Sequence, residues 1–480
     1  MTTPAEVIAG IRSGPTGPQI GAFFDLDGTL VQGYTAGTFW ADRIKKGEVS
    51  PVEFTKTIVA ALDGTLFGGD IARFGELGLA GFAGHSEDDL AELGERLFLQ
   101  KIAGTIRAEA RDLVRAHRAA GHTVVVASAA THAQIAPVAR DLGIDHVLCT
   151  ELDSEDGILT GTSSTGLLWG EAKAKAVRSF ARTHKVKLPD SHAYANGQED
   201  IAFLASVGKP HALNPHPVLK VAAEDYGWPV VTMKEPGSPG LRSVLGTAGL
   251  LAGMNVGVGV AATIGLLKGS RRDGFNAGMP FGADLGLALA GVRLNVTGRD
   301  NLTAARPAVF IGNHQSALDV AIYAALVRQN FTGVAKKELS RDPRMMALAA
   351  ITDPVFVDRG DSAKARASLD RAVERIRSGT SVVIMPEGTR SATPVLGPFK
   401  KGAFHMAMQA GVPIVPIVVR NAGELMWNKS MVVHPGTVDV HVLDPVPTDH
   451  WTPENLSDRI AEIRQSYVDT FEDWPQEDDA

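Results

Sequence analysis

The chain has 480 residues, which predicts two or three domains, and 44% of them are hydrophobic, enough to build substantial cores. The formal net charge of −7 argues against nucleic acid as a partner, although it leaves room for a local basic site. Cys149 is the only cysteine, so an intramolecular disulfide is excluded and a reducing compartment fits the composition.

The N-terminus is predicted to be a flexible lead-in. Its first twenty residues include Gly14, Pro15, Gly17 and Pro18, which favour irregular backbone. They lack the basic start, the long apolar run and the cleavage site of a signal peptide, so we expect most of the chain to lie in the cytoplasm.

Residues 21–231 are predicted to form a first α/β domain. Apolar runs that suit strands alternate with helical patterns, as in GAFFDLDGTL (21–30), RDLVRAHRAAGHTVVVAS (111–128) and SHAYANG (191–197). This alternation is typical of βαβ units around a parallel sheet. Residues from 31 to about 105 are rich in helical patterns and lack a strong strand, which predicts a helical cap over that sheet.

Two aspartates follow the first strand-like run of this domain. Asp25 and Asp27 are two positions apart, and open parallel sheets place ligands at the carboxyl ends of their strands. Two carboxylates so close repel each other unless a cation neutralises them, and such hard oxygen ligands suit Mg²⁺. For an isolated pair, an ordinary acidic turn with its corner at Asp27 and Gly28 explains the pattern equally well.

The stretch FFDLDGTL resembles the nucleophile motif of the haloacid dehalogenase superfamily, in particular its phosphoserine phosphatase-like branch. The resemblance implies a Rossmann-like fold, a nucleophile at Asp25 and a general acid or base at Asp27. It also implies a phosphate-binding hydroxyl at Ser128, in VVVAS, and a cation at Lys173, in GEAKAKA. Lys175 is the less suitable choice for that cation by its spacing.

This resemblance covers residues 22–231 and departs from the family pattern at the implied magnesium site. The family has GDS or GDG followed by a second Asp, whereas this chain reads YANGQEDIAFL. Asn196 stands in place of the expected Asp, and Asp200 is kept. The implied ligands, which also include Asp25 and Asp27, therefore lose one charge, and we expect weaker Mg²⁺ binding. Phosphatase activity and a regulatory or scaffolding remnant remain alternatives.

A linker and a long apolar stretch follow the first domain. Residues 232–241, TMKEPGSPGL, combine prolines, glycines and charges, and residues 244–267 contain no charged side chain. As a helix the apolar stretch would be about 36 Å long, enough for a hydrocarbon core of about 30 Å. Basic residues on both flanks, at Arg242, Lys268 and Arg271, give no clear orientation.

Glycines in this stretch favour close packing against another helix. Gly249, Gly253 and Gly257 repeat at a spacing of four residues. Residues 242–291 are therefore predicted to be a membrane-associating helical segment, with residues 281–292 as the candidate second arm of a hairpin. A full span, a hairpin that lies on or dips into the membrane surface, and a helix buried inside the protein remain alternatives.

Residues 292–470 predict a second α/β domain, followed by an acidic tail over residues 471–480. The strand-like runs are AVFIGN, PVFVDR, SVVIMP, PIVPIVVR and TVDVHVLD, with helical patterns between them. Polar side chains follow several of these runs, where loops converge at the edge of an α/β sheet.

The first of these loops contains a histidine and an aspartate. IGNHQSALDV (311–320) places His314 five residues before Asp319, with Ser316 as the candidate cap of the next helix. The two side chains could meet across the turn, and a carboxylate bonded to one imidazole nitrogen leaves the other nitrogen able to accept a proton. On this motif alone, a helix-start histidine with Asp319 serving the helix dipole is the alternative.

Later loops add a local basic cluster that suits a phosphate group. The residues concerned are Arg359 after PVFVD, Glu387, Gly388, Thr389 and Arg390 in MPEGTRS, and Lys400 and Lys401 in PFKKGAFHMA. Each charge alone fits a solvated surface, but their order along the chain favours one phosphate-binding site.

The order of these motifs resembles the glycerolipid acyltransferase family, in particular the 1-acylglycerol-3-phosphate acyltransferases, over residues 292–447. NHQSALD resembles its N-H-x-x-x-x-D motif, and VFVDR, PEGTRS and VPIVPI resemble three further blocks. The second block begins Pro354-Val355 rather than with the Gly-x often seen, a minor departure. The resemblance implies that His314 is a general base oriented by Asp319.

The same resemblance assigns substrate contacts. It implies that Arg359 and residues 387–390 hold the glycerol-3-phosphate part of the acceptor and that residues 413–416 help to shape the acyl-side wall. Such enzymes use acyl-CoA or acyl carrier protein, require no metal and act at the membrane. A membrane lipid surface, a lysophospholipid acceptor and an acyl donor are thus the expected partners.

The predicted function is acyl transfer to the free hydroxyl of 1-acyl-glycerol-3-phosphate, giving phosphatidic acid at the cytoplasmic face of the membrane. One alternative makes the Mg²⁺-dependent phosphatase the main activity, with the second half as a membrane module. A non-enzymatic lipid-sensing scaffold is the other. The sequence does not fix the acyl chain, the acyl carrier or the oligomeric state.

Overall fold

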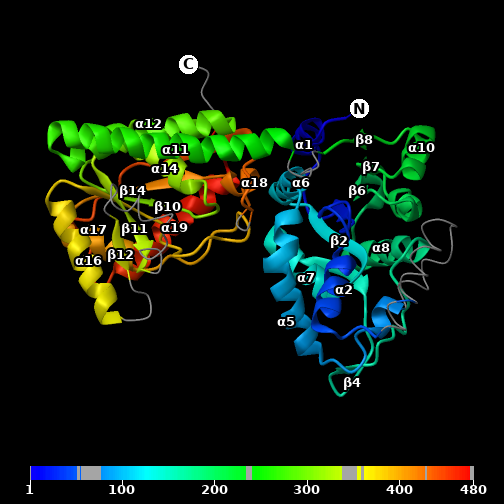
Figure 1. The fold of residues 1–480 in the computed structure, drawn as a ribbon. Helices are drawn as coiled ribbons and strands as arrows, with labels where there is room; N and C mark the ends of the chain where they lie inside the picture. The colour runs from blue at the N-terminus through cyan, green and yellow to red at the C-terminus, as the bar shows by residue number, and fades with distance from the viewer. Residues whose placement is uncertain are drawn as a thin grey trace. The chain divides into compact units, whose positions relative to one another are not determined.

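The structure is a computed structural model that describes residues 2–50, 55, 77–233, 240–337, 354–357, 362–427 and 430–475. The chain divides into two compact units, Met1–Pro236 and Gly237–Ala480 (Figure 1). Each unit is built around its own sheet with helices packed on it, which confirms the predicted α/β fold class for both halves.

The first unit contains a parallel sheet in the order β3-β2-β1-β6-β7-β8. Its strands are β1 (Gly21–Phe24), β2 (Thr123–Thr131), β3 (His146–Thr150), β6 (His192–Ala195), β7 (Lys209–Leu213) and β8 (Val230–Val231). The chain order reverses between β1 and β6. Such a switch point is where open parallel sheets bind ligands, at the carboxyl ends of the strands.

Helices and a small ribbon complete this unit. They are α1 (Pro4–Arg12), α2 (Thr35–Lys46), α5 (Glu87–Leu97), α6 (Ala108–Ala119), α7 (His132–Leu142), α8 (Glu171–His184), α9 (Ile201–Leu204), α10 (Pro217–Tyr226), and the ribbon β4 (Ser154–Glu155) with β5 (Ile158–Leu159). In the predicted cap region, the described residues form helices and turns and no named strand. The core includes Phe23 of β1, whose ring meets that of Phe180 edge to face.

The N-terminus contradicts the predicted flexible lead-in, because α1 is a capped and packed helix. Thr3 and Glu6 form a reciprocal capping box at its start. Val7 and Ile11, four residues apart, form its buried face. This helical periodicity precedes the glycines and prolines, which only end the helix.

The second unit contains a seven-stranded sheet in the order β12-β11-β13-β10-β14-β15-β9. Its strands are β9 (Val292–Thr297), β10 (Val309–Gly312), β11 (Phe331–Lys336), β12 (Val355–Val357), β13 (Ser381–Ile384), β14 (Ile414–Val419) and β15 (Gly436–Val442). All neighbours are parallel except β14 and β15. The central strand β10 lies between β13 and β14, so the loop after it opens at the middle of the carboxyl edge.

The helices of the second unit cover this sheet. They are α11 (Leu241–Lys268), α12 (Arg271–Ala290), α13 (Asn301–Ala304), α14 (Asp319–Val327), α16 (Ser362–Arg377), α17 (Gly402–Ala410), α18 (Ala422–Leu425) and α19 (Leu456–Glu472). α19 continues into the predicted acidic tail, and the Arg420 guanidinium lies 5.3 Å from the ring of Trp474, so the tail is ordered at least that far. Residues 476–480, like residues 234–239 of the predicted linker, lie outside the described residues.

α11 and α12 form an antiparallel hairpin along one face of the second unit (Figure 1). α12 contributes Phe275 and Met279 to the same core as Phe310 of β10, so it packs between the sheet domain and α11. A Cβ atom added to Gly257 of α11 would lie 2.5 Å from the Cα of Gly282, so glycine is what permits this approach.

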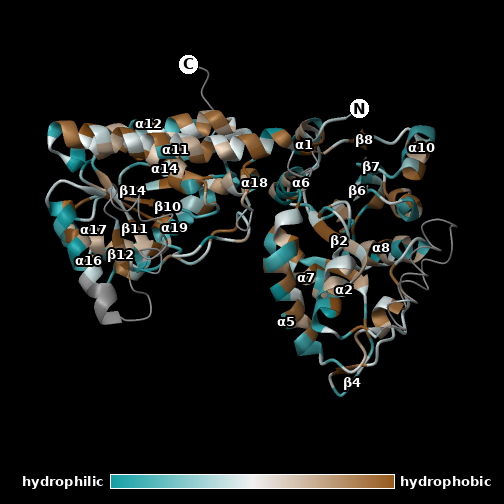
Figure 2. Cartoon of the chain, in the orientation of Figure 1, coloured by the Kyte–Doolittle hydropathy of each residue, from teal (hydrophilic) through white to brown (hydrophobic). Residues whose placement is uncertain are grey.

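α11 keeps most of its apolar surface exposed. Leu241, Leu245, Leu251, Leu266 and Leu267 are between 59% and 84% exposed. Figure 2 draws most of the helix in white and brown, the apolar half of its scale. Among the described residues, α11 is the one helix long and apolar enough to cross a membrane by length and composition. The exposure excludes the alternative of a helix buried inside the protein.

Candidate functional sites

The first unit brings three predicted site residues into one buried ion network. The Lys173 Nζ, on α8, lies 2.9 Å from Asp25 Oδ1 and 2.6 Å from Asp200 Oδ1. Burial disfavours the ammonium, but the two carboxylates outweigh it and raise the pKa of Lys173. Lys175, the alternative cation, is exposed on the same helix. The phase of α8 therefore selects Lys173 for the site.

Asp27 is turned toward the start of α2. Its Oδ1 accepts the backbone N–H of Thr35 at 2.8 Å, and its Oδ2 accepts the Thr35 hydroxyl at 3.2 Å. Burial, which outweighs these two bonds, raises the pKa of Asp27 to about 7. A carboxyl group with such a pKa can both donate and accept a proton near neutral pH.

Asn196 lies at the end of β6, beside the turn that carries the aspartates. The Thr29 hydroxyl donates to Asn196 Oδ1 at 3.2 Å and lies 3.4 Å from Asp25 Oδ2. A Cβ on Gly28, whose φ is +78°, would collide with the Asn196 amide. The sequence motif contained Thr29, but its role as a link between Asp25 and Asn196 depends on strand pairing.

The oxygen ligands for a cation are only partly assembled. Asp200 Oδ2 is buried and has no hydrogen-bond partner among the described residues, which suits a cation ligand. Among the residues that the structure describes, no group of three or more His, Cys, Asp or Glu side chains could hold a metal. Asn196 replaces one carboxylate of the expected set, and both oxygens of Asp27 are bonded to Thr35.

Two further side chains lie near this edge of the sheet. Ser128 is buried near the end of β2, and its hydroxyl accepts the N–H of Ala130 at 3.2 Å. Arg107, which the sequence analysis did not single out, is buried and donates to the Gly28 carbonyl at 3.4 Å. Its position before α6 gives no motif that would identify it.

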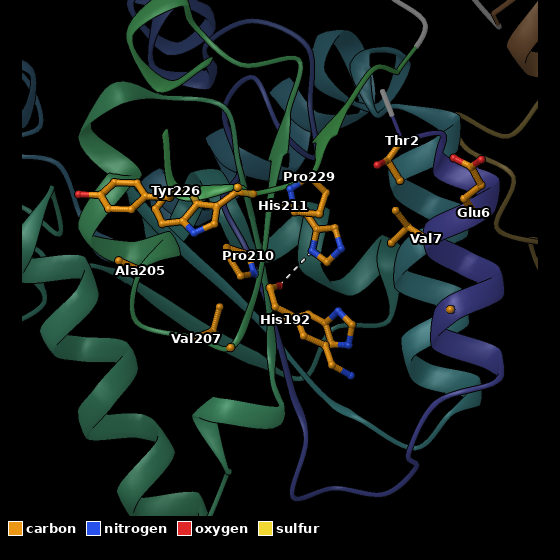
Figure 3. A pocket seen from close by; sticks show the side chains of 15 residues that line it. Thr2, Glu6, Val7, His192, Ala205, Val207, Pro210, His211, Tyr226 and Pro229 are labelled. Carbon is orange, nitrogen blue, oxygen red and sulfur yellow. Dashed lines mark hydrogen bonds between the residues drawn. The ribbon is translucent and has the colours of Figure 1, made fainter. Parts of the chain in front are cut away.

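A cavity of about 880 Å³ lies elsewhere in the first unit (Figure 3). It is lined by His192 and His211 from β6 and β7, together with Val7 of α1. His192 begins β6, whereas Asn196 follows its end, so the cavity opens at the opposite edge of the sheet from the ion network. Burial lowers the pKa of His192 to about 3 and that of His211 to about 4.

The second unit brings together the predicted histidine and aspartate. His314 follows β10, and its Nδ1 lies 2.7 Å from Oδ2 of Asp319, the first residue of α14. The Asp319 side chain is fully buried, whereas that of His314 is 22% exposed. No described residue hydrogen-bonds His314 Nε2. The imidazole is thus held at one nitrogen and open at the other.

Asp319 also organises the backbone of the histidine loop. Its Oδ2 accepts the N–H groups of Gln315 at 2.8 Å and Ser316 at 2.9 Å. The prediction that Ser316 caps the helix is wrong, because α14 begins three residues later, at Asp319, with Leu318 as its cap. Ser316 instead donates to the Met426 carbonyl and accepts the N–H of Leu318, since it lies too early to reach the first helical turn.

Polar neighbours of His314 fasten this loop to the end of β14. Asn313 exchanges two hydrogen bonds of 2.8 Å with the backbone of Val419. Gln315 donates to the carbonyls of Val419 and Arg420. The Tyr323 hydroxyl donates to the Asn313 carbonyl at 2.8 Å. Asn313 and Gln315 stood within the quoted motif, but their partners lie about a hundred residues away and leave no local signal.

Glu387 lies against the backbone of the histidine loop. Its Oε1 accepts the N–H of His314 at 2.8 Å, and its Oε2 accepts the N–H of Gly397 at 2.9 Å. The side chain is buried, and burial raises the pKa of Glu387. Both carboxylate oxygens are therefore bonded within the protein.

The predicted phosphate-binding residues divide into three groups. The Lys400 side chain passes close to the backbone of Gly388, and the neighbouring Arg390 and Thr389 are exposed. Lys401 is instead bonded through its Nζ to the Ser457 hydroxyl, at the start of α19. Arg359 lies outside the described residues, so its placement stays a prediction.

The predicted acyl-side wall, residues 413–416, forms part of the sheet. Pro413 accepts the N–H of Val309, and Pro416 stands beside Ile311 in the parallel pair of β14 with β10. Its contact with an acyl chain remains a prediction.

Two α/β units, one with an Asp–Lys–Asp network and one with a His–Asp pair, define the chain as a fusion of two enzyme-like domains. Residues 22–205 match the family described as haloacid dehalogenase-like hydrolase, and residues 293–420 match the family described as Acyltransferase. The chain belongs to the haloacid dehalogenase-like hydrolases through its first half, and part of its second half is similar to acyltransferases.

Three curated relatives show the same division. A putative hydrolase from Mycobacterium leprae is 34% identical over 51% of this chain and 84% of its own length. A phosphoserine phosphatase from Mycobacterium tuberculosis is 32% identical over 48% of this chain and 76% of its own length. A 1-acyl-sn-glycerol-3-phosphate acyltransferase from Saccharomyces cerevisiae is 35% identical over 38% of this chain, which spans only 62% of that relative's length.

Proposed function

We propose that the protein transfers an acyl group from acyl-CoA, or from acyl carrier protein, to the free hydroxyl of 1-acyl-glycerol-3-phosphate and so forms phosphatidic acid. The bond of 2.7 Å between His314 Nδ1 and Asp319 carries this proposal. It fixes the imidazole with Nε2 available as a base, and a substrate that brings its own hydroxyl needs no protein nucleophile. The similarity of the second half to acyltransferases of 1-acyl-glycerol-3-phosphate supports the choice of acceptor.

In the proposed reaction, His314 Nε2 takes the proton of the acceptor hydroxyl as its oxygen attacks the thioester carbonyl. The carbon–sulfur bond then breaks, the new ester forms, and the thiolate leaves with the proton from the imidazolium. The N–H groups of His314, Gln315 and Ser316 are bonded to carboxylates. We therefore assign oxyanion stabilisation to the loop after β13, where the N–H of Thr389 has no acceptor among the described residues.

The exposed face of α11 is proposed to lie on the cytoplasmic face of the membrane. Its leucines supply an apolar surface, and Arg242, Lys268 and Arg271 flank it with positive charge. Because α12 packs on the sheet domain, the hairpin would keep that domain at the lipid surface. The expected result of a flotation assay is binding to vesicles of anionic phospholipid, weakened by Leu251→Asp. Equal flotation of both proteins would count against this surface.

The function is tested with purified full-length protein and labelled acyl-CoA. Label is expected in phosphatidic acid when 1-acyl-glycerol-3-phosphate is supplied. The matched control is a diacyl acceptor without a free hydroxyl, with which no transfer is expected. Failure with the lysophospholipid from either acyl-CoA or acyl carrier protein would contradict the proposal.

A second activity, phosphate monoester hydrolysis, is proposed for the first unit. The observation that favours it is the pair of aspartates with distinct surroundings, Asp25 beside the Lys173 ammonium and Asp27 with a pKa of about 7. Asp25 would attack the phosphorus while Asp27 protonates the leaving oxygen, then activates the water that hydrolyses the phosphoaspartate. Asp25-dependent release of phosphate from phosphoserine, lysophosphatidate or phosphatidate is expected. If no such release is found, the alternative of a regulatory or scaffolding remnant is favoured.

The carboxylates of Asp25 and Asp200 and the amide oxygen of Asn196 would hold Mg²⁺ at this site. The bound ion would supply positive charge to the phosphoryl oxygens. Because Asn196 contributes no charge, Asn196→Asp is expected to lower the Mg²⁺ concentration required for binding, measured by calorimetry without substrate. Unchanged affinity would show that this position does not face the ion.

A further inference from the structure

The peptide groups on both sides of the His314 Cα are hydrogen-bonded to one loop, which begins with Glu387. Glu387 Oε1 accepts the His314 N–H at 2.8 Å. The N–H and hydroxyl of Ser391 both donate to the His314 carbonyl, at 2.8 and 3.1 Å. The Asp319 carboxylate holds the ring, so these contacts fix both the backbone and the imidazole of one residue.

Glu387 is poorly placed to hold the acceptor's phosphate itself. Its side chain is only 6% exposed, and its second oxygen accepts the N–H of Gly397. A carboxylate would also repel a phosphate, whereas Lys400, whose side chain passes over the same loop at Gly388, would attract one.

We infer that Glu387 is a positioning residue, which sets the place of the His314 base by binding its backbone N–H, and is not a ligand of the acceptor. This inference rests on the proposed acyl transfer. It assigns recognition of the phosphate to the exposed cations of the loop and alignment of the base to the buried carboxylate. Displacing a catalytic group by about 1 Å can cost about 10²-fold in rate, which is the scale of effect expected here.

The test compares Glu387→Ala and Glu387→Gln with wild type, and uses Glu462→Gln, at an exposed position on α19, as the control. Glu387→Ala is expected to lower kcat by about 10²-fold while the KM for each substrate stays within about threefold. Glu387→Gln should lose less, because its amide oxygen still accepts the His314 N–H. The control should match wild type.

The pH profile separates positioning from general damage to the fold. Asp319 and Glu387 are the titratable groups bonded to His314, on α14 and in the loop after β13. Glu387→Gln removes one negative charge near the base, so the acid limb of kcat/KM should move to lower pH. Thermal unfolding should show both variants folded, and hydrogen exchange at the His314 peptide should be faster than in wild type for Glu387→Ala, which has no acceptor for the N–H, but nearly unchanged for Glu387→Gln.

A higher acceptor KM with unchanged kcat would overturn the inference, as would full activity in both variants. Should Glu387→Ala fail to fold, Glu387→Gln decides the question. Should wild type transfer no acyl group, the proposed function fails, yet hydrogen exchange still shows whether Glu387 holds the His314 N–H. Unchanged exchange in Glu387→Ala, which removes the acceptor, would then contradict the positioning role.

Discussion

The first unit places a buried ammonium between two buried carboxylates, whereas the second holds one buried carboxylate with a partly exposed histidine and two backbone N–H groups. In the first site, the Lys173 ammonium pairs with both Asp25 and Asp200, so its removal leaves two buried carboxylates without this cation. Around Asp319, much of the compensation comes from the backbone, so His314 can change its protonation state during a reaction. This difference predicts that mutations in the first site mainly lower the stability of the protein, while those in the second mainly lower the rate of its reaction.

The largest expected effect is on acyl transfer and comes from Asp319→Asn. The amide oxygen could still accept the N–H groups at the Oδ2 position, but it carries no negative charge to stabilise the imidazolium that His314 becomes when it accepts a proton. We expect kcat to fall by about 10³-fold, with a smaller change in the midpoint of thermal unfolding. If Asp319→Asn unfolds the protein while the remaining folded molecules keep their kcat, the proposed contrast between the two sites is wrong.

Lys173→Ala is expected to act on stability instead. It leaves Asp25 and Asp200 buried without their cation, which should cost about 3–5 kcal/mol in free energy of unfolding. Lys175→Ala, two residues away but exposed, should change stability by no more than about 0.5 kcal/mol. Denaturant unfolding followed in the first unit measures both, and equal stability of the two variants would refute the role of the ion network.

The α11–α12 hairpin offers a pair of glycines that differ only in their surroundings. Gly257 meets the backbone of Gly282, whereas a Cβ on Gly259 would contact no atom within 4 Å. Gly257→Leu should therefore destabilise the hairpin by about 1–3 kcal/mol, and Gly259→Leu should not. The free energy of unfolding of the second unit is measured for both variants. An equal loss of stability would show that the cause is helix propensity and not packing against α12.

Acidification should weaken the first unit through its buried histidines. Burial holds the pKa of His117, His192 and His211 below the ordinary value of 6.5, to about 3 for His192 and about 4 for His211. Below pH 6.5 the unfolded chain binds protons that the folded unit does not, so stability falls as pH falls. His192 and His211 each contribute up to about 1.4 kcal/mol per pH unit between the unfolded pKa and the folded one, measurable by urea unfolding. His211→Phe should reduce that slope, and an unchanged slope would exclude this residue.

Residues close in sequence carried most of what could be predicted. The pairing of His314 with Asp319 follows from a five-residue spacing across one turn, whereas Lys173 was implied by the resemblance to the haloacid dehalogenase superfamily. β9 was missed because it is an edge strand with mostly half-buried residues and no run of large apolar side chains. The sequence did not predict the hydrogen bond between Glu387 and the His314 N–H, because this bond joins loops 73 residues apart. Such pairings are set by sheet order, which no local pattern specifies.

The glycines of the hairpin show the same limit. The repeat in α11 was visible, and it predicted close packing. The matching repeat in α12, which includes Gly278, Gly282 and Gly286, acquired its meaning only when the two helices were seen face to face. A short polar and glycine-rich stretch resembles a loop until its partner is known.

The central claim is that His314 is the base of an acyl transfer, and one assay tests it directly. Wild type and His314→Ala, both verified as folded by thermal unfolding, are compared for transfer from acyl-CoA to 1-acyl-glycerol-3-phosphate. The variant is expected to lose about 10²–10⁴-fold in kcat/KM, because no other described group lies in its place to accept the hydroxyl proton. Undiminished phosphatidic acid formation by His314→Ala would contradict the account.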